Sequence, residues 1–128
     1  MIVNQSPSAL YTALSDTTRI ADMLPAFLPK MGRDRISLSE DTVQAKVVGF
    51  NLGVRICNRT PYSKVEYERY SGPFPFFITV FIDPAPNSAS SFHIEFTAEL
   101  NGMQRLVLGR KLREGVDKIT DEIAAYYQ

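Results

Sequence analysis

The chain has 128 residues, a length typical of one domain, and its 14 basic and 14 acidic residues cancel to a formal charge of zero. A neutral chain without a basic block is poorly suited to bind nucleic acid, because that recognition depends on Lys and Arg. Its one cysteine, Cys57, excludes an intrachain disulfide, and no apolar run reaches the ~20 residues of a membrane-spanning helix. Residues 1–6 lack the basic and apolar regions of a signal peptide, so we expect a cytoplasmic protein with one domain over residues 1–128.

The first part of the chain predicts a short strand followed by two short helices. Residues 1–5 are a β-branched start that we expect at the edge of a sheet. Ser6 is the expected N-cap of the first helix, with Pro7 in the first turn, where its missing N–H has no consequence. Asp16 is the expected N-cap of the second helix, which we expect to end at Pro25.

Between residues 35 and 100 the apolar residues recur with a period of two, which predicts strands. We expect about six strands, over residues 36–39, 43–49, 52–57, 64–69, 76–82 and 92–100. Turns are expected at 50–53 and 72–75, and a longer loop over 83–91. Short connections favour antiparallel neighbours, and polar side chains on one face favour a sheet that is covered on one side only.

The last expected element is a helix over residues 101–127, with Asn101 as N-cap and Gln104 as its capping-box partner. At about 100° per residue its apolar side chains fall on one side; they are Leu108, Leu112, Val116, Ile119, Ile123 and Tyr127. A helix of ~35 Å can cross a small domain, and its apolar side needs a broad apolar surface to lie on. The element order therefore predicts an α+β fold in which a curved antiparallel sheet of six to seven strands surrounds one long C-terminal helix.

Several short motifs follow one another in a specific order along the whole chain. Residues 5–8 lead into Tyr11 and residues 14–16, Asp34 precedes a strand, residues 72–76 open another, and residues 99–101 open the helix that ends over 118–124. This order resembles the helix-grip fold of the START-like, or SRPBCC, superfamily, which includes pollen-allergen-like proteins, lipid-transfer domains and polyketide cyclases. The resemblance implies a cavity between the curved sheet and the long helix, reached under the loop after the second helix.

The residues that we expect to bind a ligand in this cavity are mostly apolar or aromatic. They are Met23, Phe27, Met31, Phe50, Val54, Ile56, Tyr67, Arg69, Phe76, Ile78, Phe92, Ile94, Phe96, Leu108, Leu112 and Val116. Gly109 and Gly115 lie on or near the inward side of the helix. Their missing side chains leave room for a ligand, or else they allow close packing on the sheet or a kink.

Four polar residues could carry chemistry, and each has a structural alternative. Arg69 shares a strand face with Tyr67, so either it meets an anionic or carbonyl ligand, or a bulge turns it to water. The Tyr67 phenol could serve a ligand or a backbone carbonyl. His93 has no second ligand or nucleophile beside it, and Cys57 is one isolated thiol, so we expect no metal and no cofactor.

Three functions remain open on the sequence. The first is binding or transport of a hydrophobic small molecule such as a lipid, a sterol or a polyketide-like compound. The second is a cyclase or dehydratase, for which Arg69, Tyr67 and His93 are the candidate acid–base groups. The third is an interaction domain without a ligand. Phe77 and Phe81 fall on the outer sheet face, where they could form a homodimer contact.

Overall fold

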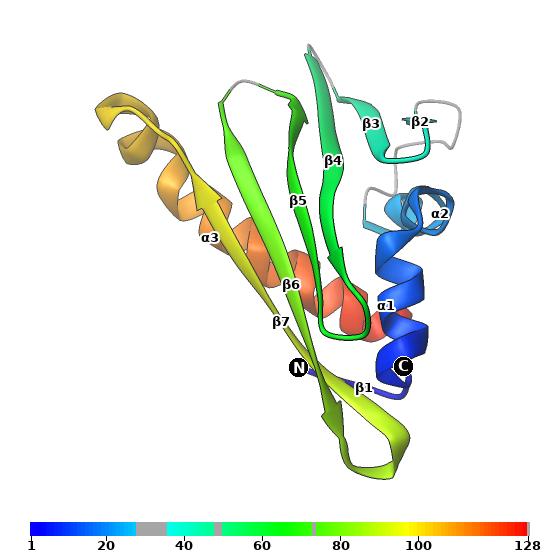
Figure 1. Cartoon of the computed structure of the whole chain (residues 1–128). Helices are drawn as coiled ribbons and strands as arrows, with labels where there is room; N and C mark the ends of the chain where they lie inside the picture. Colours follow the sequence, from blue (N-terminus) through cyan, green and yellow to red (C-terminus); the bar gives the residue numbers. More distant parts are fainter. Residues whose placement is uncertain (28–35, 48–49, 73, 128) are drawn as a thin grey trace.

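The protein is a curved seven-stranded antiparallel sheet with one long helix crossing it (Figure 1). The structure is a computed structural model that describes residues 1–27, 36–47, 50–72 and 74–127, with the side chains of all of these except 24–27, 46–47, 50–51 and 107–108. The strand order is β1-β7-β6-β5-β4-β3-β2. The α+β class and the helix-grip arrangement predicted from the sequence are confirmed.

The helices and strands follow the predicted order. They are β1 (Ile2–Val3), α1 (Pro7–Ser15), α2 (Thr17–Phe27), β2 (Ile36–Leu38), β3 (Thr42–Val47), β4 (Phe50–Thr60), β5 (Lys64–Ser71), β6 (Phe76–Ala85), the 3-10 turn η2 (Pro86–Ser88), β7 (Ala89–Ala98) and α3 (Gly102–Tyr126). In Figure 1, α3 crosses behind the strands, while α1 and α2 lie to one side, next to the C-terminal end of α3.

The three predicted helix starts are confirmed by hydrogen bonds. The Ser6 hydroxyl accepts from the Ala9 amide at 3.2 Å, and Asp16 Oδ1 accepts from the Thr18 amide at 2.9 Å. At the start of α3, Asn101 Oδ1 accepts from the Gln104 amide at 2.8 Å. In return, Gln104 Oε1 accepts from the Asn101 amide at 3.0 Å, which completes the capping box.

Three predicted boundaries are wrong, because hydrogen bonding continues where the sequence pattern stops. Helix α2 runs two residues past Pro25, since proline near a helix end removes one N–H but keeps a helical φ. The ladder between β3 and β4 continues to the pair Val47–Phe50, so β4 begins inside the predicted turn at 50–53. Likewise β6 and β7 remain paired up to Ala85 and Ala89, and the loop expected over 83–91 is only the short turn η2.

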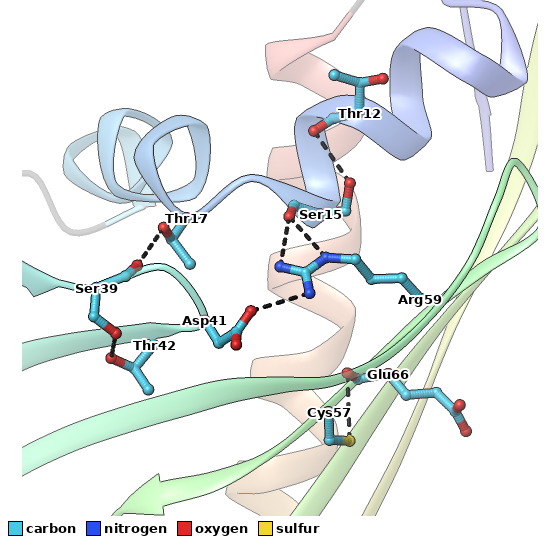
Figure 2. A network of polar contacts seen from close by, with 9 residues as sticks. All are labelled: Thr12, Ser15, Thr17, Ser39, Asp41, Thr42, Cys57, Arg59 and Glu66. Carbon is cyan, nitrogen blue, oxygen red and sulfur yellow. Dashed lines mark hydrogen bonds and ion pairs between the residues drawn. The ribbon is translucent and has the colours of Figure 1, made fainter.

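Hydrogen bonds to Arg59 of β4 and to the Ser39 carbonyl after β2 hold the adjacent ends of α1 and α2 (Figure 2). Arg59 donates through Nε and Nη2 to the Ser15 carbonyl, both at 3.2 Å, and through Nη1 to Asp41 Oδ1 at 3.0 Å. The Thr17 hydroxyl donates to the Ser39 carbonyl at 2.6 Å. These bonds join the C-terminus of α1 and the N-terminus of α2 to the β2–β4 side of the sheet. They thereby fix the position of the buried side chains that both helices turn inward.

The outer face of the sheet carries polar side chains and two aromatic rings. Phe77 is 47% exposed, as its predicted outward position requires. Phe81 is half-buried because its ring stacks on His93, with ring centroids 4.7 Å apart and an interplanar angle of 12°. Among the described helices, none combines the length and the hydropathy that crossing a lipid bilayer requires.

Candidate ligand pocket

A pocket of about 320 Å³ lies between the concave face of the sheet and α3. Its lining comes from α1, α2, four strands and α3; the residues are Leu14, Ile20, Met23, Val54, Tyr67, Ile78, Val80, Ile94, Phe96, Lys111, Leu112, Gly115, Val116, Ile119 and Ile123. All are apolar or glycine except Tyr67 and Lys111. Such a lining, with few polar groups, is typical of sites that hold apolar small molecules.

Strand register explains why these side chains converge. Residues directly opposite each other in an antiparallel pair point to the same face of the sheet. Tyr67 pairs with Ile78, and Ile78 pairs with Phe96, which places one row of three side chains across β5, β6 and β7. A second row in the pocket is the pair Val80–Ile94. The part of the concave face that borders the pocket on β5, β6 and β7 is therefore apolar apart from the Tyr67 hydroxyl.

The pocket is closed at one end and open at the other. The lining side chains that α1 and α2 contribute, Leu14, Ile20 and Met23, are buried, as is Ile123 of α3. Other lining side chains are partly exposed or exposed; they include Phe96 of β7 and, on α3, Lys111 and Ile119. A bound molecule would thus have its inner end enclosed and its outer end near solvent.

The ring of Tyr67 lines the closed end of the pocket, and its hydroxyl already forms a hydrogen bond within the protein. The hydroxyl donates to the Leu14 carbonyl near the C-terminus of α1. Burial raises the pKa of Tyr67, and the nearby Tyr127 raises it further while Arg59 opposes the change. Of the two alternatives for this phenol, the structure selects the backbone partner, so Tyr67 supplies a ring surface to the pocket.

Lys111 is the only charged residue among the described residues of the lining. Its side chain is exposed at the rim, and no carboxylate among the described residues forms an ion pair with it. Its methylene chain lies along the apolar surface while the ammonium remains near water. This arrangement offers one positive charge to the outer end of a bound molecule.

Gly109 and Gly115 of α3 are not required for close packing. A Cβ built on Gly109 or Gly115 meets no heavy atom within 4 Å outside the neighbouring helix backbone. The close-packing alternative is therefore wrong for both positions. Gly115 lies in the pocket lining, so its missing side chain leaves part of the pocket volume open.

Half of the residues expected to bind a ligand lie in the lining; they are Met23, Val54, Tyr67, Ile78, Ile94, Phe96, Leu112 and Val116. Four further expected positions lie outside the described residues or side chains; they are Phe27, Met31, Phe50 and Leu108. Six lining residues belong to faces that the sequence pattern already placed inward, but they were not on the expected list: Leu14, Ile20, Val80, Gly115, Ile119 and Ile123. The sequence pattern gave no reason to expect Lys111 in the lining, because a lysine at the border of an apolar stripe normally faces water.

Four expected residues lie elsewhere, for different reasons. Ile56 and Phe92 are 4% and 1% exposed and belong to the packed core beside the pocket. Phe76 packs against other aromatic rings, stacking on Phe96 with centroids 5.8 Å apart. Arg69 is exposed, and its Nη1 donates to the Gly72 carbonyl at 3.4 Å. Arg69 pairs with the pocket-lining Val54, so it lies on the concave face but outside the lining, and the register irregularity opposite Gly53 and Val54 comes after it. The alternative of a solvated arginine therefore fits the structure, but the bulge does not turn Arg69 to the outer face.

The remaining polar candidates do not face the pocket. The His93 side chain is 59% exposed on the outer face, with Nε2 3.8 Å from Glu95 Oε1. Cys57 is exposed at a bulge of β4, where its thiol donates to the Glu66 carbonyl at 3.5 Å (Figure 2). Among the described residues, no three His, Cys, Asp or Glu side chains gather as metal ligands would.

Comparison with known proteins shows the fold alone. No family model matches the chain, and no curated protein matches it in sequence. Solved structures match along nearly its whole length. A Chromobacterium violaceum protein gives a TM-score of 0.65 at 14% identity, covering 99% of this chain and 94% of that one. A conserved protein from Geobacillus kaustophilus gives 0.64 at 13% identity (99% and 91% covered), and a Mesorhizobium loti protein gives 0.63 at 15% (98% and 93% covered).

Proposed function

We propose that this chain is a START-like domain that binds or carries a hydrophobic small molecule in the pocket between the sheet and α3. The observation that carries the proposal is the pocket itself, about 320 Å³ with a lining of apolar side chains from seven elements. Side chains around an unfilled space lack van der Waals partners on one side, so a guest of matching shape would add contacts that the free protein lacks.

The positive charge of Lys111 at the rim restricts the class of small molecule that we expect in the pocket. The closed end accepts only apolar surface, because the Tyr67 hydroxyl is engaged with the Leu14 carbonyl. The open end offers the ammonium of Lys111. A molecule with an apolar body and one acidic end, such as a fatty acid or an acidic polyketide, matches both ends. A sterol alcohol would use the apolar lining only.

The enzyme alternative has less support. A cyclase or dehydratase needs an acid or base beside the bound substrate. Arg69 and His93 lie outside the pocket lining, and the Tyr67 hydroxyl has a backbone partner. Lys111 is the one ionisable group left among the described lining residues other than Tyr67, and its position at the rim suits binding better than proton transfer.

The test uses Gly109 and Gly115, the two glycines inside α3 beyond its first residue. Gly115→Leu places a side chain in the pocket, whereas Gly109→Leu makes the same change outside the lining. Both changes favour the helix by up to about 1 kcal/mol, so neither should impair folding. With cis-parinaric acid as the fluorescent probe, we expect Gly115→Leu to weaken binding about tenfold, or ~1.4 kcal/mol, and Gly109→Leu to leave it unchanged.

The methyl ester of the same probe tests the charge at the rim. We expect it to bind a few-fold more weakly than the acid, because an exposed charge pair contributes up to about 1 kcal/mol. Equal loss of binding in both glycine variants, or no saturable binding by the native chain, would refute the pocket as a ligand site.

We further propose a homodimer through the outer sheet face. Phe77 leaves nearly half of its side chain in water, whereas Phe81 is partly covered by His93. Light scattering at high micromolar concentration should then give twice the mass of the 14.4 kDa chain. Phe77→Ser should return the mass to that of the monomer, and a native chain that stays monomeric would contradict the proposal.

A further inference from the structure

The first half of α3 carries exposed apolar and basic side chains in one row. Met103, Leu106, Arg110 and Arg113 follow one another at spacings of three, four and three residues, and we call them the docking stripe. At about 100° per residue these four side chains fall within an arc of ~80°, on the side opposite the pocket-lining Leu112. Met103 is 76% exposed and Leu106 is 89% exposed. Arg110 and Arg113 are exposed as well, and in Figure 1 the first turns of α3 extend past the end of β7.

The charges of α3 are separated along its length. Residues 102–113 contain Arg105, Arg110, Lys111 and Arg113 and no acidic residue. Residues 114–126 contain four acidic side chains, of which Asp117 is one, and a single lysine. The helix dipole favours acidic residues at the N-terminus and basic residues at the C-terminus, but the first turn has no acidic residue and the last no basic one. Helix stability therefore does not account for this separation.

We propose that the docking stripe holds the chain on the surface of an anionic lipid membrane. A membrane interface presents phosphate charges above an apolar layer, and helices that lie in it bury apolar side chains while Arg and Lys contact the headgroups. Met103 and Leu106 provide the apolar contacts, and Arg110 and Arg113 provide the charges. Arg110 also pairs with Glu114, with Nε 3.1 Å from Oε1, but both side chains are well exposed and such a pair is weak.

Other occupants match the stripe less well. A second copy of the chain could offer the acidic half of its own α3, but the exposed carboxylates there would leave Met103 and Leu106 without apolar partners. A nucleic acid would meet the arginines only, and the chain has no net positive charge. A membrane surface matches both kinds of side chain.

The docking stripe and the pocket rim lie on the same half of α3, but membrane binding by the stripe does not require ligand binding in the pocket. Lys111 marks the open end of the pocket and lies within the same basic half of α3. Because the stripe is on the side of α3 opposite the lining, a membrane there would contact the same half of the helix as the pocket rim, but on its outer side. Membrane binding is measured on the empty chain, so it can fail while the pocket still binds its guest.

The test is co-sedimentation of the chain with vesicles at low salt. We expect weak binding to phosphatidylcholine vesicles and clearly stronger binding when phosphatidylglycerol is added, with release at about 0.5 M salt. Arg110→Gln together with Arg113→Gln should weaken partitioning roughly 25-fold, because each basic residue near an anionic surface contributes about fivefold. Met103→Gln together with Leu106→Gln should weaken it about tenfold with little change in stability, because both side chains are exposed.

A matched pair separates the stripe from general charge. Arg113→Gln and Lys118→Gln remove the same charge from exposed positions of α3, but only Arg113 belongs to the stripe. We expect about a fivefold loss for Arg113→Gln and less than twofold for Lys118→Gln. Equal losses, or equal binding to both kinds of vesicle, would overturn the proposal. So would a dimer that Met103→Gln with Leu106→Gln converts to monomer. Gly115→Leu should retain vesicle binding even where it abolishes probe binding.

Discussion

Tyr67 joins the ligand pocket to the packing of α1. Its ring lines the pocket, while its hydroxyl donates to the Leu14 carbonyl and is fully buried. A phenol in this position must keep its proton to keep the hydrogen bond. The raised pKa of Tyr67 is the electrostatic expression of that requirement, since burial disfavours the phenolate.

The raised pKa predicts a loss of stability in alkali. Below the ordinary tyrosine pKa of about 10, the folded and the unfolded chain both keep the Tyr67 proton. In that range Tyr67 therefore contributes nothing to the pH dependence of the free energy of unfolding. Above it the unfolded chain releases the proton and the folded chain does not. The free energy of unfolding should then fall by up to about 1.4 kcal/mol per pH unit, and Tyr127, whose pKa burial also raises, adds to the slope.

Urea unfolding across the alkaline range measures this slope, and Tyr67→Phe should make it shallower. The variant should also lose about 1–2 kcal/mol at neutral pH, because the Leu14 carbonyl is left without its donor. Tyr70→Phe, at an exposed tyrosine, is the control and should change neither quantity. A slope that Tyr67→Phe leaves intact would show that the Tyr67 proton is not linked to folding.

For individual residues, the sequence predicted the face of the sheet on which a side chain lies better than it predicted the contacts that the side chain makes. Alternation correctly placed Tyr67 inward and Phe77 outward. It could not say that the Leu14 carbonyl would occupy the Tyr67 hydroxyl, because that contact joins residues 53 positions apart. Nor could it place Arg69, because a strand period gives the face of the sheet but not where the covering helix ends.

At the scale of elements, Arg59 fastens α1 to the sheet. The last carbonyls of a helix have no partners within it, and a cation there is favoured by the helix dipole. Arg59 donates twice to the Ser15 carbonyl and also pairs with Asp41, whereas Arg55 on the same strand binds only the Glu68 carboxylate on the outer surface. Arg59 of β4 thus connects α1 and the turn between β2 and β3, whereas Arg55 connects two neighbouring strands.

This difference predicts unequal effects of the same substitution. Arg59→Gln should lower the free energy of unfolding by about 1–2 kcal/mol, since it removes bonds to a helix end. Arg55→Gln should lower it by less than about 0.5 kcal/mol, as expected for an exposed ion pair. Denaturant unfolding of the two variants gives the comparison directly. Losses of the same size would mean that the α1 contact adds nothing to an ordinary surface pair.

Helix starts were more predictable than the ends of strands. A cap is a local signal, and Ser6, Asp16 and Asn101 each carry it in the residue itself. Strand ends depend on the partner strand, as the pair Val47–Phe50 shows. The turn at Asn87 and Ser88, with φ of 64° and 59°, is also shorter than its proline and serine content predicted.

At the scale of the whole molecule, element order was enough to predict the architecture. Two short helices, a run of antiparallel strands and one long amphipathic helix leave few ways to bury every apolar face. The pocket was harder to foresee, because the boundary between packed core and open space depends on where α3 rests against the sheet. Gly115 and Ile119 show this, since both face the sheet side and yet border empty space.

The separated charges of α3 also make the charge distribution along this helix asymmetric, although the net charge of the chain is zero. The N-terminal half of α3 is positive and its C-terminal half is negative, so these side chains give the helix an electric dipole along its axis. An approaching charged body would exert a torque on it before any contact forms. A chain without net charge can therefore still be oriented by a charged surface before it binds to that surface.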